Sequence, residues 1–410
     1  MKQSRFLLIG FSLCLVLLTT LLPASAQDAW FAYLYNDFDR ELVRVDLNGN
    51  QQVYNIGVAE EVYVSGWDMA FTSDGRLATY CSSIYTTNLG GAPTTLHVRD
   101  VVAQNDIMQF NLGDTFGCQT FEESFSPNGD LVAVGVVNYF PEEQPADTTV
   151  PMWQLLVVDV ATGTIVHELN PDLPLVTSAG ITIGTPLMPE VRRFTDEALI
   201  FAEVLWSASG ATDTRTYRWD YGTDTLDLIE NWGQAGLNYL DPTGELAWTA
   251  HNPDLPAGNT GGPVPANNVI QISENGGEAR TIFTSPAFVI LDTQFINNGQ
   301  QLAVLTMPSF DPNNDAQNFT LAWIALNRDG TLAGLHDNLT SGDIEPAPNG
   351  YVLYEVAYSG TDFGDVSLSL TYFQNGQQST LWQSNADGWQ LVWASPTETQ
   401  ADLAPFPSIP

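Results

Sequence analysis

The chain has 410 residues and is strongly acidic, with 48 Asp and Glu against 12 Lys and Arg and a formal net charge of −36. Such a surface repels phosphate groups, which excludes nucleic acid and anionic lipid as electrostatic partners. Helical hydrophobic patterns are nearly absent, and 33 glycines with 24 prolines are typical of a turn-rich, all-β protein.

The N-terminal segment, residues 1–26, has the pattern of a signal peptide. Lys2 and Arg5 precede an apolar run over residues 6–22, and small residues at 24–26 form a cleavage site. We therefore expect an exported protein that is extracellular, at the cell surface or periplasmic. A retained membrane anchor is the alternative. No later stretch is long and apolar enough to span a bilayer, so we expect no membrane insertion after the signal is removed.

A short turn followed by an apolar strand recurs along the mature chain. In the clearest copy, residues 125–134, Pro127 presets the φ of a turn and Gly129 supplies a positive φ, before the apolar strand that starts at Leu131. Three further copies begin at Phe71, Leu240 and Phe295, and two degraded copies begin at Phe194 and Ile344. From Gly75 to Gly350 the copies average 55 residues apart, which is typical of four-stranded propeller blades with extra loop.

Between these turn units lies a second pattern, a polar turn joining two strands. It appears at residues 40–55, 94–112, 154–169, 215–229, 268–283, 318–335 and 368–382. Residues 30–35 form a strand with no turn unit before it, and residues 389–394 form a strand with no hairpin after it. We expect these two strands to share one blade and close the ring, with the last strand innermost.

The resulting prediction is an all-β, seven-bladed β-propeller. Six or eight blades are the alternatives, because the unit at Phe194 is degenerate and residues 170–191 are long enough to hold another strand pair. We expect a single propeller domain over residues 27–395 and a loose, proline-rich tail over residues 396–410.

The aromatic–Ser/Thr–Pro–Asp/Asn–Gly turn followed by Leu-x-Val resembles the WD40-like repeats of exported bacterial propellers of the TolB type. The turn from Asp159 to Gly163 is similar to the Asp-x-x-Thr-Gly turn of related bacterial propellers. The resemblance covers almost the whole mature chain and is specific to architecture. It implies a module that binds proteins or small ligands.

The long connections are expected on one face of the disc, because antiparallel strands send them out on the same side. Candidate binding residues in them are Tyr139, Phe140, Glu142, Trp206, His251, Phe310, Tyr358 and Phe363. An aromatic group beside carboxylates grips a basic peptide or stacks a sugar ring; packing within the loops is the alternative interpretation. We expect a protein or peptide partner, with a basic one favoured by the charge and a glycan less favoured.

A calcium site is predicted at Asp311, Asn313 and Asp315, whose side chains offer several oxygens. The run lacks the closing glutamate of a helix-loop-helix site, so solvated acidic residues are the competing interpretation. The stretch from Asn36 to Asp39 is a second candidate for such a site.

Cys81 and Cys118 are the two cysteines that remain after export, an even number for an oxidising compartment. We expect Cys81 at the end of the second strand of one blade and Cys118 at the start of the next blade, joined by a disulfide. Two free, buried thiols are the alternative.

No residue cluster has the spacing of a catalytic site. His97 and His167 fall in predicted strands, where a structural role is expected, and no histidines are paired at metal-ligand spacing. A Gly-x-Ser-x-Gly nucleophile turn is absent from the sequence. The sequence therefore favours a binding module without catalysis. The alternative is a propeller glycoside hydrolase or lyase that uses carboxylates in the central funnel.

Overall fold

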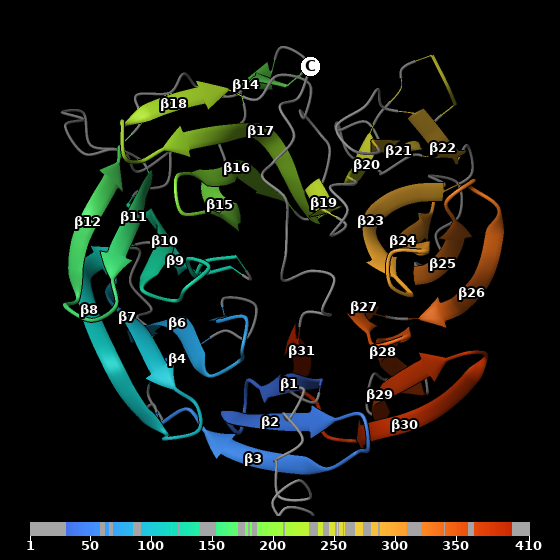
Figure 1. Cartoon of the computed structure of the whole chain (residues 1–410), viewed down its shortest axis with the longest axis horizontal. Helices are drawn as coiled ribbons and strands as arrows, with labels where there is room; N and C mark the ends of the chain where they lie inside the picture. Colours follow the sequence, from blue (N-terminus) through green and yellow to red (C-terminus); the bar gives the residue numbers. More distant parts are fainter. Residues whose placement is uncertain are drawn as a thin grey trace, which may run out of the picture.

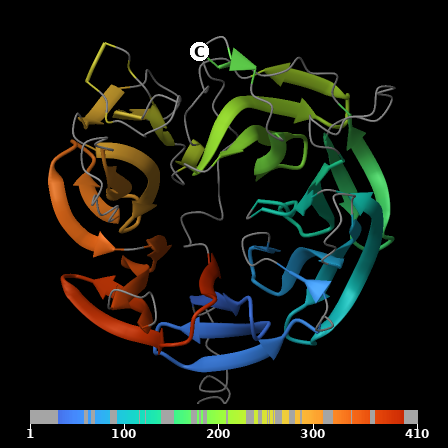
Figure 2. The ribbon, with the colours of Figure 1, turned by 180° about the vertical axis from the view of Figure 1, so that it is seen from behind.

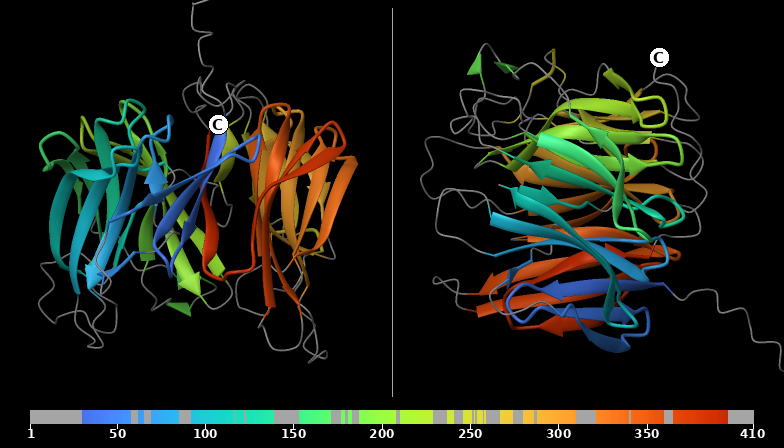
Figure 3. Two further views of the ribbon diagram at one scale, coloured as in Figure 1. Left: turned by 90° about the horizontal axis from the view of Figure 1, so that it is seen from below. Right: turned by 90° about the vertical axis from the view of Figure 1, so that its left-hand side faces the viewer.

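The computed structural model describes residues 30–395 apart from 58–61, 65–68, 85–91, 116, 122, 139–152, 171–176, 179–180, 183–186, 208–209, 229–236, 241–245, 251, 253, 257, 259–266, 274–279, 286–287, 310–320, 340 and 360–364. Its sheets stand around a ring, which Figures 1 and 2 show from opposite sides. Seen from the edge, the strands run between the two faces of a disc (Figure 3). The all-β propeller fold expected from the turn repeats is confirmed.

Both ends of the described chain share one sheet, which we call the closing blade. Its order is β3 (Gln51–Asn55), β2 (Glu41–Asp46), β1 (Phe31–Asn36) and β31 (Trp389–Ala394), with β31 innermost. Strands β1 and β31 run antiparallel, and Asn36 lies opposite Trp389. The expected closure of the ring by the two terminal strands is therefore confirmed.

Five further sheets repeat the same four-stranded order. From the inner to the outer strand, the first two are β9 (Gly117–Gln119), β10 (Leu131–Val137), β11 (Trp153–Asp159) and β12 (Thr164–Leu169), then β15 (Leu187–Phe194), β16 (Leu199–Ser207), β17 (Gly210–Asp220) and β18 (Thr225–Leu228). The third and fourth are β19 (Leu237–Leu240), β20 (Leu246–Ala250), β21 (Val269–Ser273) and β22 (Arg280–Thr284), then β23 (Phe288–Ile296), β24 (Gln301–Pro308), β25 (Leu321–Asn327) and β26 (Leu332–Leu339). The fifth is β27 (Ser341–Ala347), β28 (Gly350–Ser359), β29 (Asp365–Gln374) and β30 (Gln377–Ser384).

The described ring therefore has six four-stranded blades, where seven equivalent ones were expected. The remaining large sheet is irregular and has five strands: β4 (Val62–Tyr63), β5 (Ala70–Phe71), β6 (Leu77–Ile84), β7 (Ala92–Asp100) and β8 (Asn105–Thr115). Two short strands share the inner position, because β4 pairs with one end of β6 and β5 with the other. The strand pair considered within residues 170–191 is present as β13 (Thr177–Ser178) and β14 (Ile181–Thr182), in a separate sheet.

A hydroxyl side chain explains why the turn unit recurs. The Ser126 Oγ accepts a hydrogen bond of 2.9 Å from the backbone N–H of Leu131, and the Thr72 Oγ1 accepts one of 3.0 Å from that of Leu77. The degraded copy has no glycine, yet its Thr195 Oγ1 still accepts a bond of 3.0 Å from the N–H of Ala198. The Ser or Thr therefore closes each of these three turns, even in the copy without glycine.

Apolar clusters fill the space between neighbouring sheets. Every residue of β10 after Leu131 is buried, as expected for a strand covered on both faces. At the closing blade, the Trp393 ring lies 5.2 Å from Phe31 and 5.7 Å from Phe71 between ring centroids, and the Tyr33 ring stacks on Phe71 at 4.9 Å. Within the described segments, the chain forms no helix both long and apolar enough to cross a membrane.

Candidate binding face

The connections within and between blades define two faces of the disc. In each four-stranded sheet, the connection from the second to the third strand emerges on the same side as the connection to the next sheet. Two hydrogen bonds show this pairing: the Asp37 N–H donates to the Gly388 carbonyl at 2.9 Å, and the Ser285 N–H donates to the Asn268 carbonyl at 2.8 Å. We call this side the loop face.

The structure corrects the expected position of Trp206. It lies in β16 opposite Ala211 of β17, so residues 206–207 and 210–213 belong to paired strands instead of a long loop. Tyr358 likewise lies in β28, opposite Val366 of β29. Neither residue is in a connecting loop, because strand pairing continues further than the polar composition of these segments indicated.

The other candidate binding residues lie outside the described residues: Tyr139, Phe140, Glu142, His251, Phe310 and Phe363. The calcium candidates Asp311, Asn313 and Asp315 also lie outside them. Where the chain is described, no three His, Cys, Asp or Glu side chains are grouped so that they would hold a metal ion. These assignments stay predictions.

An exposed phenylalanine on the loop face was missed as a binding residue. Phe38 lies in the turn between β1 and β2, and 72% of its surface is exposed. The buried Asn36 organises this turn, because its Oδ1 accepts hydrogen bonds of 2.8 Å from the N–H groups of both Phe38 and Asp39. Its Nδ2 donates to the Asp387 carbonyl at 3.2 Å, which joins the turn to the segment before β31. The aromatic ring is thus displayed by a backbone that is already ordered.

Gly388 leaves room for the Phe38 ring, which packs against the position that a Cβ would occupy. A Cβ built on Gly388 would lie 2.4 Å from the Phe38 Cδ2, and Gly388 has a φ of +86°, which favours glycine for a second reason. A larger residue at 388 would therefore displace the ring. The sequence signal for this site was the stretch from Asn36 to Asp39, which had been weighed only as a metal ligand set.

Three aspartates lie in the two segments that meet at this ring: Asp37 and Asp39 flank Phe38, and Asp387 precedes Gly388. Asp39 and Asp387 are exposed, and the Asp37 Oδ2 accepts a hydrogen bond of 2.7 Å from the Gln390 Nε2 of β31. An exposed ring beside acidic groups is suited to contact a partner that carries both apolar and cationic side chains.

A second ordered part of the loop face lies before β21. The buried Asn268 donates through its Nδ2 to the carbonyls of Asn252, Leu255 and Pro256, each at 3.1 Å, and its Oδ1 accepts from the Asn252 N–H at 2.8 Å. This single side chain holds the described part of the loop, in which Leu255 is exposed.

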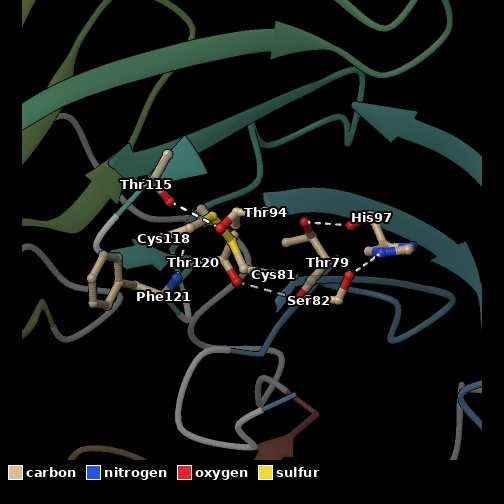
Figure 4. Close-up of a disulfide and its surroundings, with 10 residues drawn as sticks. Thr79, Cys81, Ser82, Thr94, His97, Thr115, Cys118, Thr120 and Phe121 are labelled. Atoms are coloured by element: carbon tan, nitrogen blue, oxygen red, sulfur yellow. Dashed lines mark hydrogen bonds between the residues drawn. A yellow bond between two sulfur atoms is a disulfide. The ribbon is translucent and has the colours of Figure 1, made fainter. Parts of the chain in front are cut away.

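The expected disulfide is confirmed. Cys81 and Cys118 are bonded, with their Cα atoms 5.9 Å apart, and Figure 4 shows the bond between the two sheets. Cys118 lies in the inner strand β9, but Cys81 lies in the middle of β6 instead of at its end. The bond is therefore buried within the apolar cluster between the sheets, among residues such as Leu96 and Val132.

The inner strands contain both apolar and charged side chains. Glu190 in β15, Asp292 in β23 and both Asp343 and Glu345 in β27 are half-buried, and Arg193 in β15 is buried. Burial lowers the pKa of Arg193 from its usual value, and the negative charge of Glu123 opposes this change. The strands around the centre of the ring thus carry apolar, acidic and basic side chains.

Comparison with known proteins finds distant structural similarities only. No protein family and no curated protein matches the sequence. Among solved structures, the β-propeller domain of the Trilobed protease from Pyrococcus furiosus has a TM-score of 0.42 and 13% identity, over 79% of this chain and 84% of that one. Prolyl oligopeptidase B from Galerina marginata has a TM-score of 0.48 and 10% identity, over 87% of this chain and 48% of that one. The WD40 domain of SCAP from fission yeast has a TM-score of 0.39 and 9% identity, over 87% of each chain.

Proposed function

We propose that this chain is an exported, acidic β-propeller that binds a protein or peptide partner through its loop face. The N-terminal pattern of residues 1–26 supports export, and the repeat resemblance to bacterial TolB-type propellers supports the same compartment. The observation that carries the proposal is Phe38, an aromatic side chain exposed over 72% of its surface on a turn held by hydrogen bonds.

The partner is expected to present a Lys- or Arg-bearing segment with an apolar side chain. Contact with the apolar side chain would remove the exposed Phe38 ring from water, and the carboxylates of Asp39 and Asp387 would attract the cation. Because these acidic groups are exposed, their attraction is screened by salt. Binding should therefore weaken as the ionic strength rises, and a residual apolar contribution should persist.

The test presents a random peptide display library to the immobilised protein and compares the enriched sequences with those of two variants. We expect enrichment of Lys or Arg next to an apolar residue. Phe38→Ala should weaken binding of these peptides by about 2 kcal/mol, roughly 30-fold. Leu332→Ala is the matched control, because Leu332 is 64% exposed but lies on the outer strand β26. Equal loss in both variants, or enrichment without cationic residues, would contradict the proposal.

A second candidate function is a glycoside hydrolase or lyase that uses carboxylates of the central funnel. It is supported by the half-buried Glu190, Asp292 and Glu345 on inner strands, together with the buried Arg193. Turnover of aryl glycosides that is lost in Glu190→Gln or Glu345→Gln, but retained in Phe38→Ala, would favour this function over peptide binding.

A further inference from the structure

Three side chains on adjacent strands of the five-stranded sheet form a continuous hydrogen-bonded relay. The Ser82 Oγ lies 2.7 Å from the His97 Nε2, and the His97 Nδ1 lies 3.0 Å from the Asp106 Oδ2. The three residues come from β6, β7 and β8 in that order. Figure 4 shows the contact between Ser82 and the His97 ring as a dashed line.

The sheet register explains why these side chains meet. Tyr80 lies opposite His97, so Ser82, two residues further along β6, points to the same face of the sheet as Tyr80. The Tyr80 and His97 rings stack at 4.9 Å with an angle of 10° between their planes. On the other side, the register shifts between Val98 and Arg99, and Arg99 then lies opposite Asp106. The bulge brings the Asp106 carboxylate within reach of His97 as well as Arg99.

Asp106 is held in place by two other side chains. Its Oδ1 accepts a hydrogen bond of 2.8 Å from Arg99, and its Oδ2 accepts one of 2.7 Å from the Gln109 Nε2. Arg99 is itself fixed by the carbonyls of Asn55 and Gln104, at 3.1 Å and 2.7 Å. Burial by itself would raise the pKa of Asp106, but the hydrogen bonds from His97, Gln109 and Arg99 outweigh it and lower the pKa to about 2.

The ionised carboxylate selects the tautomer of His97. Because Asp106 accepts at Nδ1, a neutral imidazole carries its proton on Nδ1 and leaves Nε2 as an acceptor. The Ser82 hydroxyl must then donate to Nε2. This is the arrangement that activates a serine for nucleophilic attack: the base is hydrogen-bonded to the hydroxyl and is itself oriented by a carboxylate.

We propose that Ser82 is a reactive nucleophile, with His97 as its general base and Asp106 as the residue that orients His97, and that the relay acts on small acyl esters. Ser82 lies near the end of β6 that reaches the loop face, and only 8% of its surface is exposed. That limited access favours small electrophiles over peptide chains. The Ser82 relay and the Phe38 binding face lie in different parts of the molecule, so each proposal can be tested independently of the other.

In the reaction, the Ser82 Oγ bonds to the carbonyl carbon of the ester while its proton passes to the His97 Nε2. The bond between that carbon and the alcohol oxygen breaks, and the alcohol leaves with the proton from His97. Water then attacks the acyl group with His97 accepting its proton, and the carboxylic acid and free Ser82 are released.

The test treats the full chain with phenylmethylsulfonyl fluoride, which sulfonylates an activated serine with loss of fluoride, and maps the adduct by mass spectrometry. Ser83 is an internal control, because it is the next residue and is more exposed. We expect a single adduct on Ser82, formed in native but not in urea-unfolded protein and at least about tenfold faster than on Ser83.

Two histidine variants separate an active relay from a structural network. His97→Gln should slow the labelling of Ser82 on the order of 100-fold. His336→Gln is the matched control, because His336 also lies in a strand and bonds a hydroxyl, that of Tyr351, at 2.7 Å. In the His336→Gln variant, Ser82 should be labelled at the wild-type rate. Circular dichroism reports folding of both variants. If labelling instead follows exposure, so that Ser83 reacts as fast as Ser82 in the native protein, the proposal is wrong. This outcome can be measured even if His97→Gln does not fold.

Discussion

Breaking the bond between Cys81 and Cys118 should lower the stability of the propeller by a calculable amount. The two cysteines are 37 residues apart in sequence, and the segment between them contains the whole of β7 and β8. In the chain-entropy model, a loop of this length stabilises the folded state by about 3.8 kcal/mol at 25 °C, because the bond restricts the unfolded chain. Reduction removes this contribution and leaves the buried side chains nearly unchanged in volume.

The assay is urea unfolding followed by tryptophan fluorescence, with and without reductant. The oxidised protein should unfold at the higher urea concentration. The double variant Cys81→Ala/Cys118→Ala provides the control, because its unfolding should not respond to the reductant. If the oxidised and reduced proteins differ by less than about 1 kcal/mol, the entropy argument fails for this bond.

Three further predictions test the fold. In urea denaturation, Gly330→Ala should destabilise the protein by about 3 kcal/mol or more, because the added Cβ would lie 1.9 Å from the Ile282 carbonyl oxygen. Gly376 is the matched control, because it has a similar positive φ but open space around it. Gly376→Ala should therefore cost only about 1–2 kcal/mol in the same assay. Trp393→Ala should cost about 3–5 kcal/mol in thermal or chemical unfolding, because its buried ring packs between β1 and β5. The folded-state pKa of Asp106 is lowered from 3.8 to about 2, so its contribution to stability is present above pH 4 and is lost as the pH falls through 2. Asp106→Asn should flatten that part of the curve of melting temperature against pH, and an unchanged curve would show that other carboxylates dominate acid unfolding.

The architecture was predictable because it depends on local chemistry. A turn that begins with Ser or Thr closes on its own backbone, and an apolar strand must be covered on both sides, so the repeat of Ser126 and Thr72 is visible without any coordinates. Ring closure was predictable by elimination, since residues 30–35 and 389–394 each lacked neighbours within their own blade.

The errors have a common physical cause. Composition does not determine where strand pairing stops, so Trp206 was assigned to a loop although β16 and β17 remain paired there. For the same reason Cys81 was placed at the end of a strand that continues beyond it. The two short inner strands β4 and β5 were missed because each has only two residues, which is too short for an alternating pattern.

Both candidate sites depend on contacts that are distant in sequence. Phe38 became recognisable only once its turn was seen to be joined to Gly388 and Asp387, more than three hundred residues later. Ser82, His97 and Asp106 are 15 and 9 residues apart, and a bulge in the pairing of β7 and β8 precedes the contact between Arg99 and Asp106. No fixed spacing in a sequence encodes such a bulge.

The pairing of β1 with β31 has a consequence for synthesis of the chain. The edge of β1 that accepts residues 389–394 stays unpaired in the nascent polypeptide until those residues have been made. Until then this edge can pair with any other extended segment, including one from a second nascent chain. A message truncated before codon 389 would therefore yield material that polymerises edge to edge, even though every other blade is encoded in full.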